Sequence, residues 1–287
     1  MFFKDHLRLV TDAGLSFDLG WDYDAPYNID PLNGVDVDIQ TAQGINQTGT
    51  TVERQNVSGI SRTLSVVFWG AAALDNARAF ARSLPYYTQG TLYFGDAYFT
   101  RFVVQKTPYF SSYTPEPRCE LMLYSPKPFW YSLTAQETLY GGLSPAFSFP
   151  VCYDSHQYSV KLGGAVLLLH NTGSLAVPFT ATLHSGGTVV NPKVVDLQTG
   201  AFLRFDLTME QDDQLEIYRT TSDRLACTLT HEGKLSNIFS ALDEDSTLTE
   251  LQPGDNVLAL QADTGEDDLQ AHIRFYPMEA GILPEPL

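Results

Sequence analysis

Short runs of alternating apolar and polar residues, separated by Gly and Pro, recur along almost the whole chain of 287 residues. A period of two residues suits a strand with one buried face, because successive side chains point to opposite sides of the backbone. In the first half, Leu64, Val66 and Phe68 face one way, and residues 98–104 and 119–124 alternate similarly. The alternation predicts a mostly β protein with antiparallel strands.

One stretch has the period of a helix instead. The apolar side chains of residues 71–84 share one helical face: Leu74, Ala77, Phe80, Ala81 and Leu84. The charged side chains share another face: Asp75, Arg78 and Arg82. Gly70 precedes the stretch and Pro85 stops it, since proline cannot continue a helix. We expect a single amphipathic helix that covers one face of a sheet.

The stretch from Leu121 to Tyr131 indicates where the chain divides. A strand-like run ends there in Pro126-Lys127-Pro128, and three large aromatic residues follow. Gly and Pro pairs then interrupt residues 134–164, which we interpret as a linker and domain entry. We expect a first β-sandwich over residues 1–133, carrying the helix, and a second over residues 165–287, where strands and turns recur at short intervals.

The charge is strongly acidic and unevenly spread. The net charge is -17; residues 1–150 hold 10 basic and 14 acidic side chains, and residues 151–287 hold 7 and 20. Such a surface repels nucleic acid, so we expect no direct nucleic-acid binding. No apolar run approaches the roughly 20 residues that cross a bilayer. The start, residues 1–6, meets a charge at once and lacks the apolar region of a signal peptide.

The chain shows no motif for catalysis, a cofactor or a metal. Neighbouring acidic residues occur as Asp22/Asp24, Asp36/Asp38, Asp212/Asp213, Asp243/Asp245 and Asp267/Asp268. Such pairs are expected by chance in an acidic chain, and a glycosidase needs two carboxylates facing each other across a cleft. The loop at Asp243 could offer oxygens to calcium, but it lacks the glycine of an EF-hand.

Histidines and cysteines support the same conclusion. The histidines, His6, His156, His170, His184, His231 and His272, have no metal-ligand spacing. Cys119, Cys152 and Cys227 are too few and too widely spaced for a disulfide framework, and two of them alternate with apolar residues as buried thiols do. We therefore expect no catalytic, cofactor-binding or metal-binding residues, no cofactor and no enzyme.

Several motifs occur in an order that resembles a known family. In the first half, a strand with an arginine (residues 61–68) is followed by a short helix, an aromatic hairpin (residues 92–102) and a strand that runs into Ser-Pro-Lys-Pro-Phe-Trp-Tyr. The second half has Asn171-Thr172-Gly173, the strand entry at residues 191–194, residues 251–257 and the closing residues 273–282. This order resembles the distal tail proteins, which form the baseplate hub of bacteriophages with long non-contractile tails.

The resemblance implies a galectin-like second sandwich and a structural role in the virion. Members of the family form hexameric rings through the N-terminal domain. Each ring joins the tail tube protein to the tail-tip protein and leaves a channel for DNA. We therefore expect a phage or prophage protein that is assembled in the bacterial host cytoplasm and resides at the tail tip. We expect a neutral or acidic lumen, without unpaired arginines from the set Arg54, Arg62, Arg78, Arg82 and Arg101.

Two other functions remain open on the sequence alone. The second sandwich could be a carbohydrate-binding or adhesion module that uses a tyrosine such as Tyr218. The three tryptophans, however, all lie in the first half, at positions 21, 69 and 130, whereas sugar platforms often use one. A tail-associated hydrolase is the weaker alternative, because no nucleophile or metal motif accompanies it.

Overall fold

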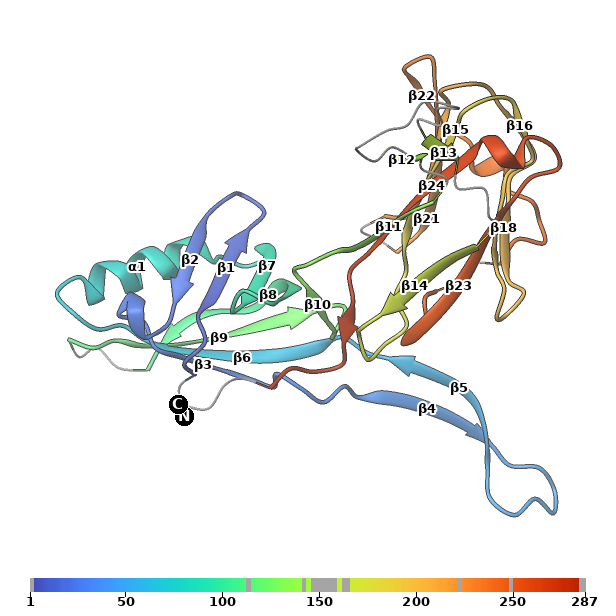
Figure 1. Cartoon of the computed structure of the whole chain (residues 1–287). Coiled ribbons are helices and arrows are strands. Elements are labelled where there is room, and N and C mark those ends of the chain that lie inside the picture. The colour runs from blue at the N-terminus through green and yellow to red at the C-terminus, as the bar shows by residue number, and fades with distance from the viewer. Residues whose placement is uncertain are drawn as a thin grey trace. The chain divides into compact units, whose positions relative to one another are not determined.

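The computed structural model describes residues 3–111, 115–140, 143–145, 159–161, 166–220, 223–247 and 250–283 (Figure 1). Strands dominate them, so the mostly β fold class is confirmed. The described part has one α-helix and three 3-10 turns: η1 (Trp21–Tyr23), η2 (Phe239–Ala241) and η3 (Glu266–Asp268). None of these helices is long and apolar enough to cross a bilayer. The chain forms two compact units, residues 1–134 with 278–287, and residues 135–277.

The first unit is built on a nine-stranded antiparallel sheet, in which the main path runs β2-β1-β7-β8-β9-β6-β3. Its strands are β1 (Leu7–Thr11), β2 (Ser16–Leu19), β3 (Tyr27–Asp30), β6 (Ile60–Val67), β7 (Gln89–Phe94), β8 (Tyr98–Phe110), β9 (Arg118–Ser125), β10 (Trp130–Ser132) and β25 (Met278–Glu279). Strand β10 pairs with β8 and β25. Strands β7 and β8 form the expected hairpin around Gly95-Asp96, with Phe94 opposite Tyr98.

The helix expected over residues 71–84 is α1 (Ala73–Ser83). It lies along one face of the sheet in Figure 1, and it buries Ala73, Ala77 and Phe80. The Phe80 ring meets the ring of Phe17 edge-on, with centroids 5.4 Å apart. The placement of Leu74 on the buried face was wrong: its side chain is 47% exposed. Ala73 takes the inward position, so the next residue turns about 100° toward solvent.

A second hairpin of this unit was not expected from the sequence. Strands β4 (Val37–Ala42) and β5 (Thr51–Val57) pair only with each other and form a separate two-stranded sheet. Every residue of β5 is exposed, and every residue of β4 except the half-buried Ala42. Figure 1 shows the hairpin running out from the first unit. We call residues 37–57 the arm.

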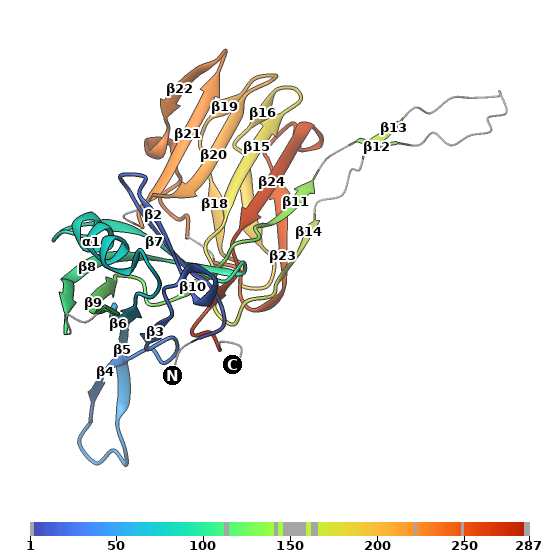
Figure 2. The same ribbon diagram turned by 90° about the vertical axis from the view of Figure 1, so that its left-hand side faces the viewer.

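The second unit contains two main antiparallel sheets with a core between them. One has the order β11-β24-β15-β20-β21-β22 and the other β14-β23-β17-β18; Figure 2 shows the strands of the first side by side. The strands of the first are β11 (Gln136–Tyr140), β15 (Thr180–Ser185), β20 (Gln214–Arg219), β21 (Leu225–His231), β22 (Lys234–Asn237) and β24 (Leu269–Phe275). The strands of the second are β14 (Val166–Asn171), β17 (Lys193–Asp196), β18 (Phe202–Arg204) and β23 (Gly254–Gln261). Short pairs join β12 (Leu143–Pro145) to β13 (Ser159–Lys161) and β16 (Val189–Val190) to β19 (Thr208–Met209).

The expected linker over residues 134–164 contains a strand of the second unit. Strand β11 pairs with β24 from Gln136 opposite Phe275 to Tyr140 opposite Ala271. The glycines at 141–142, taken as the sign of a linker, end this strand instead; they and residues 146–158 and 162–165 lie outside the described residues. The linker assignment was therefore wrong for residues 136–140.

The end of the chain also departs from the expected domain boundaries. Residues 278–287 belong to the first unit, not to the second. Strand β25 pairs with β10, Trp130 lying opposite Glu279. Ile282 is 4% exposed within the first core. We call residues 278–283 the C-terminal strap. The strap packs on the first unit because Ile282 is buried in its core and β25 pairs with β10.

Candidate assembly surfaces

The described residues hold no cluster that suggests metal or acid chemistry. No three His, Cys, Asp or Glu side chains among them lie close enough to hold a metal ion. The structure does not bring the acidic pairs together at one place. Asp243 instead shares Arg204 with Asp206 and Asp263, at distances of 4.0, 3.2 and 3.1 Å. An ion pair of this kind is structural.

The cysteines that can be described are inert. Cys119 and Cys227 are buried and free. Burial raises the pKa of the Cys119 thiol to about 12 and that of Cys227 to about 11. A nucleophilic cysteine needs a lowered pKa, so neither thiol is activated. Cys152 lies outside the described residues.

Four histidines each meet one carboxylate. The pairs are His6–Asp18 at 3.1 Å, His170–Asp255 at 2.6 Å, His231–Asp213 at 2.7 Å and His272–Glu137 at 3.3 Å. The hydrogen bond that His231 donates to Asp213, whose side chain is only 3% exposed, raises the pKa of His231 above its usual value. His156 lies outside the described residues.

The arginine of β6 is a buried cation, and no carboxylate of the described residues pairs with it. Arg62 is 1% exposed and occupies the same inward face as Leu64. Its guanidinium donates to the carbonyls of Pro31 at 3.1 Å and Pro128 at 2.7 Å, and to the Ser125 hydroxyl. It also stacks 5.0 Å from the Trp130 ring centroid. Burial lowers its pKa to about 10, so it stays charged at neutral pH.

We call Arg62 and its contacts the Arg62 node. The node gives the residues from Ser125 to Trp130 a structural role. In this stretch, the Ser125 hydroxyl and the Pro128 carbonyl accept hydrogen bonds from Arg62, and the Trp130 indole covers the guanidinium. The Trp130 indole N–H donates to the carbonyl of Leu32 at 2.9 Å, and the amide of Ile282 reaches the same oxygen at 3.3 Å. The node therefore fastens four separate segments of the first unit.

The other arginines of interest are on the surface. Arg101 makes a two-pronged pair with Asp12, at 2.8 and 2.9 Å, and Arg78 pairs with Asp75 at 3.2 Å. Arg54 and Arg82 are exposed and have no ion pair within the described part of the chain. Arg62, being buried, cannot line a lumen. Of the five arginines that we expect not to line a lumen unpaired, only Arg54 and Arg82 remain to be tested.

The arm has one apolar and one polar face. The pairings Val37 with Val57, Ile39 with Gln55 and Thr41 with Val52 lie on one side. Asp38 opposite Asn56 and Gln40 opposite Arg54 lie on the other. Val37, Ile39, Val52 and Val57 are 45%, 52%, 48% and 41% exposed. A two-stranded hairpin is marginal in water without a hydrophobic partner, so this apolar face is suited to burial in an assembly.

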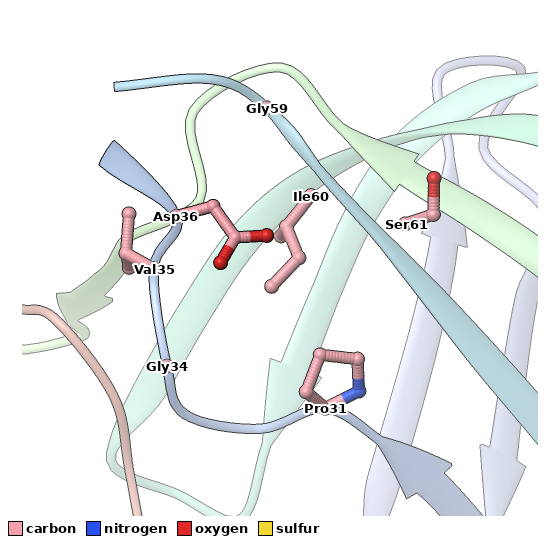
Figure 3. A pocket seen from close by; sticks show the side chains of 7 residues that line it. All are labelled: Pro31, Gly34, Val35, Asp36, Gly59, Ile60 and Ser61. Atoms are coloured by element: carbon pink, nitrogen blue, oxygen red, sulfur yellow. The ribbon is translucent and has the colours of Figure 1, made fainter. Parts of the chain in front are cut away.

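A polar pocket lies where the arm leaves the sheet (Figure 3). Its volume is about 540 Å³, and it is lined by Pro31, Gly34, Val35, Asp36, Gly59, Ile60 and Ser61. Asp36 is its one charged lining residue. Gly59 is required by close approach, because a Cβ there would lie 2.4 Å from the Tyr124 hydroxyl.

Exposed aromatic side chains gather elsewhere on the first unit. Tyr86 and Tyr87 are 74% and 82% exposed and lie edge to face, with ring centroids 5.3 Å apart. Trp21, 40% exposed, meets Trp69 at 5.2 Å. Exposed aromatic pairs are typical of protein interfaces. Sequence reasoning expected aromatic contacts in this half but could not say which rings are exposed.

Comparisons with known proteins agree with this picture. Residues 172–276 match the family model for the siphovirus-type tail component, C-terminal domain. The fold is similar to that of the Dit protein of phage SPP1, with a TM-score of 0.64, 12% identity, and coverage of 95% of this chain and 98% of that one. It is also similar to a chain of the phage P2 baseplate, with a TM-score of 0.53, 10% identity, and coverage of 97% and 99%. No curated protein sequence matches the chain.

By these findings, residues 172–276 of the second unit are similar to the class of siphovirus-type tail component domains. Within that class, the chain has the fold of the distal tail protein, Dit, over nearly its whole length. The resemblance noted in the sequence is thus confirmed.

Proposed function

We propose that this protein is a structural hub of a phage tail tip or baseplate. Six copies would form a ring that joins the tail tube protein to the tail-tip protein and leaves a channel for DNA. The ring would be assembled in the host cytoplasm and carried in the virion. The observation that supports this most is the Dit fold over 95% of the chain, since the SPP1 protein is described as a hub of the adsorption apparatus.

The arm supports the ring in particular. A ring needs a heterologous interface, in which one surface of each copy meets a different surface of the next. The arm projects an apolar face that nothing in the described part of the chain covers. Packing this face against a different surface of the neighbouring copy would bury it and would also form a heterologous interface.

Light scattering of the purified protein, alone at high concentration and mixed with the tube protein, tests this proposal. We expect the mass to rise to that of a multimer in at least one setting. Ile39→Asp, on the apolar face of the arm, should block this rise without lowering the thermal unfolding temperature. Gln40→Asp, on the polar face, should assemble normally. Monomer in both settings would refute the ring, and normal assembly of Ile39→Asp would refute the role of the arm.

We also infer that the protein is not an enzyme. The raised pKa values of Cys119 and Cys227 support this, because a nucleophilic cysteine needs a lowered pKa. The carbohydrate-binding alternative has no specific support: Tyr218 lies opposite Ala226, and no ring pair is found for Tyr218 among the residues that the structure describes. A galectin-like character of the second unit stays a prediction.

A further inference from the structure

The outer surface of the four-stranded sheet in the second unit is unusual for a sandwich. Along β14, the inward Leu167 and Leu169 are each 2% exposed, as a core requires. The outward positions also carry aliphatic residues, Val166 and Leu168, which are 48% and 73% exposed. An outward strand face in water is normally polar.

The strand registers make these side chains contiguous. Val166 pairs with Ala259, Ala259 with Val195, and Val195 with Phe202, which forms an apolar row across all four strands. In the next row, Leu168 pairs with Val257, whose carbonyl accepts the amide of Leu197 at 2.9 Å. Leu197 is 49% exposed. We call the following set the aliphatic face: Val166, Leu168, Val195, Leu197, Phe202 and Val257.

The opposite sheet of the same unit provides an internal comparison. One row across its outer surface joins His272, Thr182, Glu216 and Thr228 by direct pairing. All four are polar and partly exposed or exposed. The row ends at Leu139 of the edge strand β11, which lies opposite His272 and is 78% exposed. The other edge strand, β22, carries the exposed Leu235. This outer face is therefore mostly polar with single leucines at its two edges, whereas the exposed apolar side chains of the other sheet adjoin one another. Large exposed apolar patches with polar rims mark interaction surfaces.

The chemistry of the aliphatic face excludes a sugar and disfavours a membrane. Valine and leucine cannot hydrogen-bond to hydroxyl groups, and the one aromatic ring, Phe202, is covered by the Lys193 ammonium 4.0 Å from its centroid. Residues 151–287 carry 7 basic and 20 acidic side chains. Such a charge repels anionic lipid surfaces.

The rim argues against a second copy of this chain. Asp255 lies at one end of the face, paired with His170. At the other end the two cations, Arg204 and Lys193, are outnumbered by Asp206, Asp243 and Asp263. Two copies meeting face to face would bring acidic rims together, and like charges across an interface are unfavourable. A partner with a basic rim is complementary.

We propose that the aliphatic face docks a different protein, one that presents an apolar centre surrounded by basic side chains. This rests on the proposed function in one respect: the partner is another component of the tail tip. The docking surface belongs to the second unit, whereas the arm belongs to the first.

Binding measurements with the full-length chain test the proposal. The probes are the purified products of the genes flanking this one, each tested singly by biolayer interferometry at low and high salt. Leu168→Asp removes the most exposed leucine of the face. Leu235→Asp is the matched control, because Leu235 is 66% exposed on β22, away from the face.

We expect one product to bind, more weakly at high salt, and Leu168→Asp to weaken it about ten-fold or more, as loss of a central anchor does. Leu235→Asp should bind like the native protein. The proposal is overturned if no product binds, if both variants bind equally, or if Leu168→Asp instead abolishes self-association or binding to anionic vesicles. Multimer formation with the tube protein, measured on the same variants, separates failure of this proposal from failure of the ring.

Discussion

At the scale of single residues, Arg62 shows how a polar node can organise a core. Its charge has no carboxylate partner in the part of the chain that the structure describes, and three oxygens and one aromatic ring replace water around it. A buried ion is tolerated only when its hydrogen-bonding capacity is satisfied. The inward position of Arg62 was visible in the sequence, since it shares the parity of Leu64 and Val66. Its partners were not, because they come from segments far along the chain.

Replacing Arg62 should destabilise the first unit. Arg62→Met leaves the Pro31 and Pro128 carbonyls buried without a donor, at a cost of about 2–4 kcal/mol in the free energy of unfolding. Urea unfolding followed by tryptophan fluorescence measures it selectively, because every tryptophan lies in the first unit. Arg54→Met, on the exposed arm, is the control and should leave the midpoint unchanged. An unchanged midpoint for Arg62→Met would contradict the role given to the node.

His231 provides a pH-dependent contact in the second unit. Its pKa is raised above 6.5, mainly by the hydrogen bond to Asp213. The protonated form is therefore favoured by folding. The stability it adds is fully present below about pH 6.5, the unfolded value, and is lost as pH rises through the folded pKa.

NMR titration of His231 tests this contact. Asp213→Asn should lower the pKa of His231, and Asp212→Asn, at the exposed neighbouring residue, should change it little. If Asp212→Asn lowers the pKa of His231 as much as Asp213→Asn does, the nearby acidic charge, and not the hydrogen bond to Asp213, raises this pKa.

At the scale of elements, local periodicity predicted the helix and the hairpin that are determined by residues close together in the sequence. The helix at Ala73–Ser83 and the hairpin around Gly95 were both predictable, because their signals lie within a few residues. The arm was missed because an exposed hairpin buries nothing in its own chain, and the alternation of Val37 and Ile39 is short. Strand β11 was missed because its partner, β24, lies about 135 residues further on.

The C-terminal strap is another element that no local pattern predicts. Gly281 lies so close to the first unit that a Cβ would be 2.4 Å from the Cβ of Asn33. Ile282→Ala should cost the first unit about 2–4 kcal/mol, since a buried isoleucine leaves a cavity when truncated. The same tryptophan-detected urea unfolding measures the loss. Leu283→Ala, at a residue 86% exposed, should unfold like the native protein, and an equal loss in both variants would refute the role of Ile282.

At the scale of the whole molecule, the charge distribution bears on the passage of DNA. The net charge is -17, and most of it lies in residues 151–287. Lys and Arg contacts to phosphates are what give a protein salt-dependent DNA affinity. We predict no DNA binding in a gel-shift assay at physiological salt. Binding that weakens as salt is added would contradict this, and Arg54 and Arg82 would then be the first residues to replace.

The fold class and the resemblance to distal tail proteins could be read from the sequence, because both depend on the order of many local motifs. The assembly surfaces could not. The exposed fractions of Ile39, Leu168 and Tyr87 depend on which sheet each strand joins, and pairings between distant strands decide that. The division into units failed at the last ten residues for the same reason.

Electron microscopy of the purified protein bound to its tube protein tests the central claim most directly. The account predicts particles with six-fold symmetry, a central channel, and a component of six times the 31.8 kDa mass of this chain. Closed rings of this kind follow from a heterologous interface that returns on itself. Particles without a channel, or one copy of this chain bound to the tube protein, would contradict it.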